Sequence, residues 1–120
     1  LHRAEELQIR ERLVVIAQSE MGRTPNYNNG NGKDHWSIGS IMFLGPQIRG
    51  DRVIGATDDG QFAVRINPQT LALQPADGLL LRPEHMHQAL RQFAGIDQHP
   101  FSLKFPLGIT PEQQLQGIWG

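Results

Sequence analysis

The sequence contains no cysteine, no long apolar run and no marked excess of charge of either sign. Without cysteine, disulfides and thiol chemistry are excluded, although exported and cytosolic proteins are equally compatible with that absence. The longest apolar runs, LVVIA and IMFLG, are much shorter than the about 20 residues that cross a bilayer. Eleven basic and twelve acidic side chains nearly cancel and are scattered along the chain. We therefore expect no membrane span and no nucleic-acid partner.

The length of 120 residues fits one domain that can bury a core of its own. The sequence begins at Leu1 and enters the helix-like stretch HRAEELQIRERL at once, without a targeting segment. We therefore expect residues 1–120 to be a single C-terminal portion of a longer protein. Within it, residues 1–97 are the expected core and residues 98–120 an irregular tail. The composition specifies neither the compartment nor the oligomeric state.

Two short apolar runs predict the strands of an α/β fold. Residues 13–17, Leu-Val-Val-Ile-Ala, are apolar throughout and rich in β-branched side chains. This pattern is typical of a strand that is covered on both faces of a parallel sheet. The second run, at 41–44, stops at Gly45 and Pro46 and predicts another buried strand followed by a turn.

Helical periodicity appears in two stretches. Apolar side chains at spacings of three, beginning at Leu1, predict a helix over 1–10 with one buried stripe. Pro83 at a first helical position, a run of apolar side chains at helical spacing and Gly95 just past the end predict a helix over 83–94.

The intervening and final segments carry weaker signals. Residues 52–55 and 61–66 have the pattern of short strands, and the turn sequence at 67–70 leads into an apolar stretch. Together they predict a small β excursion at the edge of the sheet. A Thr-x-x-Gln capping box at 110–113 predicts one more short helix.

A polar loop over residues 18–37, rich in asparagine and glycine, follows the first predicted strand. Open α/β sheets place their chemistry just beyond the carboxyl ends of such strands. Loops longer than about 12 to 15 residues are uncommon in compact domains unless they are functional or disordered. Asp34 and His35 supply oxygen and nitrogen ligands that divalent zinc or manganese accepts, and Glu20 is placed to bind metal or act as a general base. The alternatives are hydrogen bonds that only pin the loop, and a Glu20–Arg23 pair that holds it shut.

Arg23 is the candidate for binding an oxyanion, because a guanidinium fork matches the oxygens of phosphate or sulfate. Asn31 and Lys33 are further candidate substrate-binding residues in the same loop. An arginine that caps backbone carbonyl groups is an equally common alternative. The glycines at 30 and 32 fit either a close backbone approach or a plain flexible loop.

The other histidines do not predict a metal site. His85 and His87 lie two residues apart on the predicted helix, so their side chains diverge by about 200°. We expect one imidazole near the sheet edge or the loop and the other in solvent. His2 and His99 fall in terminal segments. No Ser-His-Asp order, phosphate-binding glycine loop or paired-histidine metalloprotease motif occurs.

Four separated motifs follow one another along the chain: VVIAQSEMGRTP, NGNGKDHW, IRGDRVIGATD and RPEHMHQALRQFAGID. In this order and spacing they resemble the bacterial family called domain of unknown function 1501. Members of that family show a strand followed by S-E-F-G-R-T-P, an N-G-x-G-[RK]-D-H-W loop, a G-x-V-I-G-A-T-D segment and a helix ending in G-I-D. The resemblance covers residues 12 to about 97.

That family is similar to the alkaline phosphatase and sulfatase superfamily, whose members are doubly wound α/β hydrolases. They cleave phosphate or sulfate esters with divalent metals and a strand-end nucleophile. The resemblance implies that the chain is the C-terminal third of such a fold, with a small β excursion at its edge. In the superfamily an Asp-His-Gly ligates metal after the strand equivalent to residues 13–17. Here the sequence from Glu20 reads Glu-Met-Gly, so the carboxylate is kept and the histidine is not.

The resemblance and the loop together predict a metal-dependent hydrolase of phosphate or sulfate esters that acts on a small-molecule or glycan ester. The predicted metal ligands, for zinc, manganese or calcium, are Glu20, Asp34 and His35. The predicted catalytic residues are Glu20 and Arg23. The predicted substrate-binding residues are Arg23, Asn31 and Lys33.

Three alternatives stay open at this point. Because one superfamily ligand is absent, the chain fits a single-metal enzyme or an altered metal geometry as well as a two-metal site. It also fits a non-catalytic binding module that retains the alkaline-phosphatase-like fold. The loop alone fits a rigid Ω-loop without a site, held by a Glu20–Arg23 pair and an Asp34–His35 pair. Family members are often exported behind a twin-arginine signal, which implies a periplasmic or extracellular location.

Overall fold

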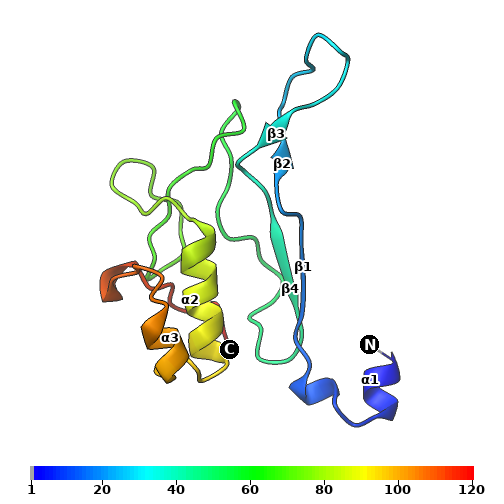
Figure 1. Ribbon diagram of the computed structural model, residues 1–120, viewed down its shortest axis with the longest axis vertical. Helices are drawn as coiled ribbons and strands as arrows, with labels where there is room; N and C mark the ends of the chain where they lie inside the picture. Colours follow the sequence, from blue (N-terminus) through cyan, green and yellow to red (C-terminus); the bar gives the residue numbers. More distant parts are fainter. Residues whose placement is uncertain (1) are drawn as a thin grey trace.

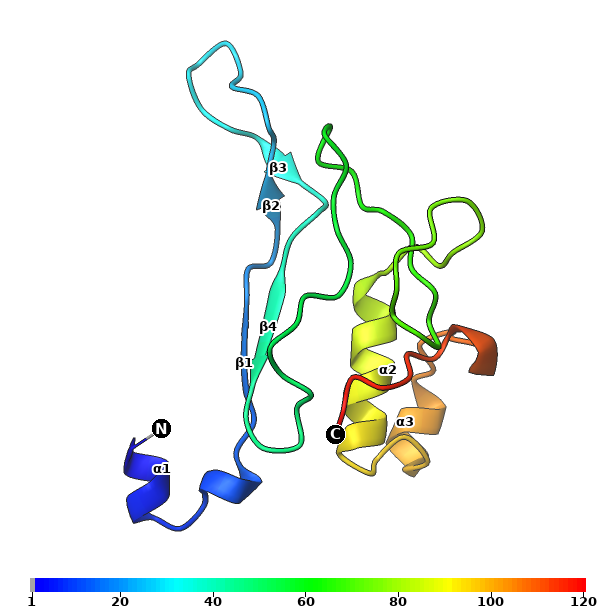
Figure 2. The same cartoon turned by 180° about the vertical axis from the view of Figure 1, so that it is seen from behind.

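A computed structural model describes residues 2–120, so the place of Leu1 in the predicted first helix falls outside the described residues. The molecule is elongated, with extents of 51 × 37 × 30 Å and a radius of gyration of 16.8 Å. A compact domain of this length has a radius of gyration of about 14 Å. Figures 1 and 2 show why: a long two-stranded arm runs beside and beyond a body that contains α2 (Pro83–Phe93) and α3 (Pro100–Lys104).

The arm is one β-hairpin with two paired sections. β1 (Val15–Gln18) pairs antiparallel with β4 (Ile41–Leu44). Further out, β2 (Gly22–Arg23) pairs antiparallel with β3 (His35–Trp36). The two predicted strands are confirmed in position. Their pairing corrects the expectation of a parallel sheet, because the two runs lie side by side in opposite directions.

The arm leaves apolar side chains at the surface. Val15, Ile16, Met42 and Leu44 are between 38% and 52% exposed. Successive residues of a strand face opposite sides, so the exposure of both Val15 and Ile16 means that neither face of this two-stranded ribbon is fully covered. A run with the composition of a buried strand is therefore exposed here. In coarse form the α/β prediction agrees with the structure, which combines helices with small antiparallel sheets.

The β excursion is present only as isolated bridges. The strands predicted at 52–55 and 61–66 are wrong as continuous strands, because turn-forming residues recur every few positions and interrupt the pairing. Single antiparallel bridges take their place: Thr57–Ala63, Ile66–Leu73 and Ile66–Leu79. The turn predicted at 67–70 is confirmed, since the Asn67 carboxamide oxygen accepts the N–H groups of the two residues that follow Pro68.

α2 is the helix predicted over 83–94. Pro83 is its first helical residue, where a missing N–H costs no hydrogen bond. Ahead of it, the backbone N–H of Arg82 donates to Nδ1 of His85 at 3.0 Å. Gly95 follows the helix with a φ of +66°, a conformation that glycine adopts without strain.

The hydrophobic core is formed by α2, the bridged loops and the C-terminal segment. Its buried members are Ile66, Leu71, Ala89, Leu115 and Ile118. Trp119 packs beside them, with its ring centroid 4.5 Å from that of Phe93 on α2 and 5.7 Å from that of Phe43 on β4. Its indole N–H donates to the Ala89 carbonyl at 3.2 Å. The C-terminal segment therefore joins the arm to the body.

Residues 98–120 are more ordered than the expected irregular tail. They contain α3 and the 3₁₀ helix η2 (Pro111–Gln113). The capping box at 110–113 is confirmed, because the N–H of Thr110 donates to Oε1 of Gln113 at 3.2 Å. Two core residues come from the same segment, Leu115 and Ile118. The segment is part of the packed body.

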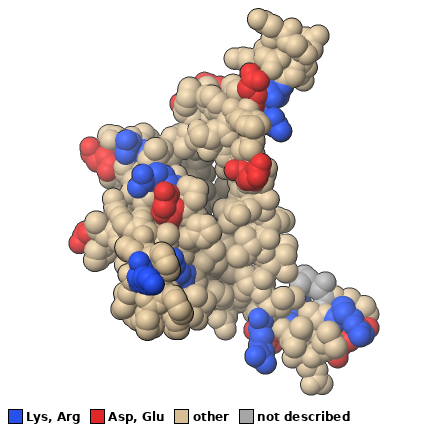
Figure 3. Space-filling view, viewed as in Figure 1, with Lys and Arg blue, Asp and Glu red and all other residues tan. Residues whose placement is uncertain are grey.

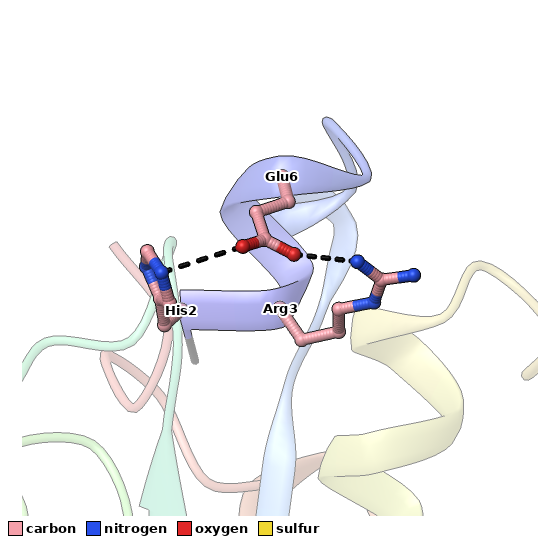
Figure 4. A network of polar contacts seen from close by, with 3 residues as sticks. All are labelled: His2, Arg3 and Glu6. Carbon is pink, nitrogen blue, oxygen red and sulfur yellow. Dashed lines mark hydrogen bonds and ion pairs between the residues drawn. The ribbon is translucent and has the colours of Figure 1, made fainter.

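The N-terminal helix is shorter than predicted. α1 (His2–Glu6) is followed by a turn and the 3₁₀ helix η1 (Arg10–Arg12). Glu6 pairs with Arg3 at 2.6 Å and with His2 at 3.4 Å (Figure 4). These pairs are exposed, so their contribution to stability is small. Across residues 2–120, no helix has the length and apolar composition needed to cross a membrane.

His85 and His87 differ sharply in environment, as the helical geometry predicted. His85, in the first turn of α2, is only 1% exposed, whereas His87 is exposed. Burial lowers the pKa of His85 below its ordinary value of 6.5. The imidazole is therefore neutral in the folded chain at a pH where it gains a proton in the unfolded chain.

His85 should make the chain sensitive to acid. A lowered folded-state pKa gives stability that is complete above pH 6.5 and is lost as the pH falls through the folded-state value. His85→Gln keeps the acceptor for the Arg82 N–H and removes the titration. We expect the midpoint temperature of unfolding, measured by circular dichroism, to fall less between pH 7 and pH 5 in this variant than in the native chain. His87→Gln is the control, and an equal shift in His85→Gln and the native chain contradicts the assignment.

Candidate functional site

The outer part of the arm carries all the residues predicted for the site. Its register places Arg23 directly opposite His35. Directly opposite residues in an antiparallel pair project from the same face, so these two side chains are cross-strand neighbours. Gly22 is needed beside them because a Cβ at this position would lie 1.8 Å from the carbonyl oxygen of Ile38.

The loop over residues 24–34, which joins β2 to β3, is organised around Asn28. Oδ1 of Asn28 accepts the N–H groups of Gly30 at 2.9 Å and Gly32 at 3.0 Å. Nδ2 of the same side chain donates to Oδ1 of Asp34 at 2.8 Å. Asn31 has a φ of +57°, which asparagine tolerates better than most residues. The 24–34 loop is therefore a defined turn rather than a flexible coil.

Thr24 and Asp34 close the base of the 24–34 loop. The N–H of Thr24 donates to the Asp34 carbonyl at 3.0 Å, and the N–H of Asp34 donates to Oγ1 of Thr24 at 3.1 Å. The Ω-loop alternative predicts two pairs as restraints on this loop, Glu20 with Arg23 and Asp34 with His35. Neither is among the ion pairs formed within residues 2–120. The loop is held by Asn28 and Thr24 instead.

Arg23 and His35 face each other at the base of the loop, and the backbone of Lys33 lies next to Arg23. Nη1 of Arg23 donates to the Lys33 carbonyl at 3.3 Å, which is the carbonyl-capping role considered from the sequence. All three side chains are exposed. Asn31 lies further out, and its N–H donates to the Asn28 carbonyl at 3.0 Å. In Figure 3, basic and acidic side chains lie next to one another along the upper arm, below an uncharged tip.

The three predicted metal ligands are on the same arm but do not form a complete site by themselves. Within residues 2–120, no three histidine, aspartate or glutamate side chains are arranged to hold an ion. Oδ1 of Asp34 already accepts from Asn28. Glu20 precedes β2, His35 follows the loop, and both are exposed. The donor set does not fit a closed metal centre.

A cavity of about 480 Å³ lies between the 24–34 loop and the turn over residues 58–62. Its walls come from both segments and carry aromatic, amide and carboxylate side chains, among them Tyr27, Asn28, Asp34, Trp36, Asp59 and Phe62. Of the predicted ligands, only Asp34 lines this cavity.

Trp36 connects the arm to the 58–62 turn. Its indole N–H donates to the Gln61 carbonyl at 2.9 Å, and its ring centroid lies 5.2 Å from that of Phe62. The turn is capped by Asp58, whose Oδ1 accepts the N–H groups of Gly60 and Phe62, each at 2.9 Å. These contacts make the turn a fixed wall of the cavity.

Sequence reasoning missed three residues that shape this region: Asn28, Asp59 and Phe62. An Asn-x-Gly-x-Gly spacing was a usable signal for Asn28, because an asparagine oxygen caps the N–H groups of the residues two and four positions later. Asp59 and Phe62 had no such signal, since their contact with the arm spans more than 20 residues.

The family described as "Protein of unknown function (DUF1501)" matches residues 5–101. The chain belongs to this family. The match includes all four sequence motifs, the whole arm and α2, and it ends within α3. No curated protein and no solved structure matches the chain.

Asn28 should be the residue on which the order of the loop depends. Asn28→Ala removes the acceptor of two backbone N–H groups and the donor to Asp34, each worth about 0.5–1.5 kcal/mol. We expect faster hydrogen exchange at Gly30 and Gly32, with core amides on α2 unaffected. Asn29→Ala is the matched control one position away. Unchanged exchange at both glycines in Asn28→Ala would contradict this role.

Proposed function

We propose that the chain binds phosphate or sulfate esters as part of an alkaline-phosphatase-like metal-dependent hydrolase. The observation that carries this proposal is the group formed by Arg23 and His35, which face each other across β2 and β3 at the base of the 24–34 loop, together with Lys33 of that loop, whose carbonyl accepts from Arg23. A guanidinium, an ammonium and an imidazole offer the N–H donors that tetrahedral oxyanions accept. The group is exposed, so an ester reaches it without a rearrangement of the core.

Arg23 is the residue proposed to hold the ester oxyanion. The bond from Nη1 to the Lys33 carbonyl orients the guanidinium toward the loop. A guanidinium has five N–H donors, so that bond leaves enough of the fork for two parallel bonds to an oxyanion. Lys33 and Asn31, in the same loop, are the proposed additional contacts to the substrate. Glu20, just before β2, is the proposed general base.

A divalent ion, zinc, manganese or calcium, is part of the proposal, with Glu20, Asp34 and His35 as contributors. These three side chains do not form a complete ligand set within residues 2–120, so no reaction step is assigned to the ion. When bound, such an ion lowers the pKa of a coordinated water and polarises an ester oxygen.

The proposed fold is the C-terminal part of a doubly wound α/β sheet to which β1 and β4 contribute an antiparallel pair. Exposed apolar side chains along β1 and β4 support this proposal, because a larger sheet with covering helices would bury them. Resemblance to exported family members supports a periplasmic or extracellular location. The proposed substrate is a small-molecule or glycan ester.

A non-catalytic binding module that retains the same fold is the second candidate. Two observations favour it. Oδ1 of Asp34 already accepts a hydrogen bond from Asn28, and the ligand set within residues 2–120 is incomplete. The two candidates share the oxyanion-binding group and differ in whether the bound ester is cleaved.

Arg23→Ala should lower the hydrolysis rate of p-nitrophenyl phosphate or sulfate by the full-length protein at least about tenfold, because a charge-assisted bidentate contact is lost. Arg23→Lys should restore part of the rate, since an ammonium keeps the charge without the fork. Arg3→Ala, an exposed arginine on α1, is the matched control. Equal rates in Arg23→Ala and the native protein would refute the role. Phosphate binding that depends on Arg23 without any hydrolysis would favour the binding module.

Elemental analysis of the purified full-length protein tests the metal assignment separately. Glu20→Gln and His35→Ala should each lower the bound metal, because each removes a donor without altering the hydrogen bonds of the 24–34 loop. His87→Ala, which removes an exposed imidazole on α2, should not. Equal metal content in all three variants and the native protein means that these residues are not ligands.

A further inference from the structure

The cavity between the 24–34 loop and the 58–62 turn has the size and the walls of a small-ligand site. Its volume of about 480 Å³ falls within the range of about 300–1,000 Å³ that is typical of such sites. Two aromatic side chains that line it are unusually exposed, with 70% of Tyr27 and 56% of Phe62 accessible. Exposed rings at a cavity offer flat apolar faces to a ligand.

The charged side chains that line the cavity are two carboxylates, while Thr24, Asn26 and the Tyr27 hydroxyl add groups that can both donate and accept. Asp34 and Asp59 are carboxylates, which only accept hydrogen bonds when ionised. Among the hydrogen bonds formed within residues 2–120, none involves the Asp59 carboxylate, whereas Oδ1 of Asp34 has one partner. No lysine or arginine is among the residues that line the cavity. An anionic group is therefore disfavoured inside it, and a ligand rich in donors is favoured.

We propose that this cavity binds a pyranose sugar ring. Such a ring has an apolar face of C–H groups, which suits Tyr27 and Phe62, and a rim of hydroxyl donors, which suits Asp34 and Asp59. The Asn28 carboxamide already makes three hydrogen bonds within the 24–34 loop, so it forms part of the cavity wall and is not assigned a bond to the sugar.

The sugar site and the oxyanion site adjoin each other. Lys33 contacts the Tyr27 ring and also supplies the carbonyl that holds Arg23. A sugar seated against Tyr27 would therefore present a substituent toward the basic side chains outside the cavity. The sugar is then the alcohol part of the ester substrate, a statement that rests on the proposed function. Binding of the sugar ring itself does not depend on hydrolysis.

Nuclear magnetic resonance of the full chain provides the test, with the methyl glycosides of glucose, galactose, mannose and N-acetylglucosamine as probes. The indole N–H of Trp36, which lines the cavity, should shift saturably with at least one probe. The indole N–H of Trp119, bonded to Ala89 in the body, is the internal control and should stay in place. An absence of any saturable Trp36 shift overturns the proposal.

Variants show whether the shift comes from this cavity. Asp59→Asn and Phe62→Leu should each weaken the probe's binding at least about threefold. Asp59→Asn keeps the shape of the side chain but replaces one acceptor oxygen by a donor, and Phe62→Leu removes the flat ring face. Asp77→Asn and Phe105→Leu, which alter exposed residues outside the cavity, are the matched controls and should not weaken it. Equal weakening in the controls, or none in the cavity variants, overturns the proposal. Choline that displaces the sugar and binds more tightly also overturns it, in favour of an organic cation.

The sugar-site proposal and the hydrolase proposal can fail independently of each other. A saturable sugar shift in a protein that cleaves no ester refutes the proposed hydrolase and supports the sugar site. Arg23-dependent ester cleavage without any sugar shift refutes the sugar site and supports the hydrolase.

Discussion

The packing of Trp119 between the arm and α2 is the contact on which the arrangement of the molecule depends. Its ring meets Phe43 on β4 and Phe93 on α2, and its N–H bonds to the Ala89 carbonyl. A two-stranded hairpin is marginal by itself, so its position relative to the body comes from such contacts. At the outer end, Trp36 makes the second link, through the Gln61 carbonyl and the Phe62 ring.

The sequence predicted those helices whose ends are set by residues next to them in the chain. Pro83 and Gly95 bound α2, and the capping box at 110–113 opens η2, because these residues act within one turn of the chain. The pairing partner of a strand is not local. An apolar β-branched run fits a parallel or an antiparallel sheet equally well, and nothing in residues 13–17 specifies β4. The same limit applies to the bridged loops, where frequent turns prevent continuous ladders.

The candidate site was predictable in part for a similar reason. Arg23 and His35 share the arm because an Asn/Gly-rich loop between two strands folds back on itself. The cavity could not be predicted, because its second wall comes from the 58–62 turn and depends on the Trp36 contact. Tertiary packing, rather than any motif, brings Asp59 and Phe62 to the arm.

The two tryptophan contacts lie at different points along the arm, one at β4 and the other at β3, and they differ in the number of interactions. Trp119 is anchored by two rings and a carbonyl, whereas the outer link consists of one hydrogen bond and one ring pair. Six residues separate Phe43 from Trp36, and the seven steps of chain between them span at most about 23 Å. A rotation of the arm by about 3° about the Phe43–Trp119 contact would displace Trp36, which lines the cavity, by about 1 Å. Substitutions around Phe43 are therefore expected to tune ligand fit from a distance, without contact with the ligand.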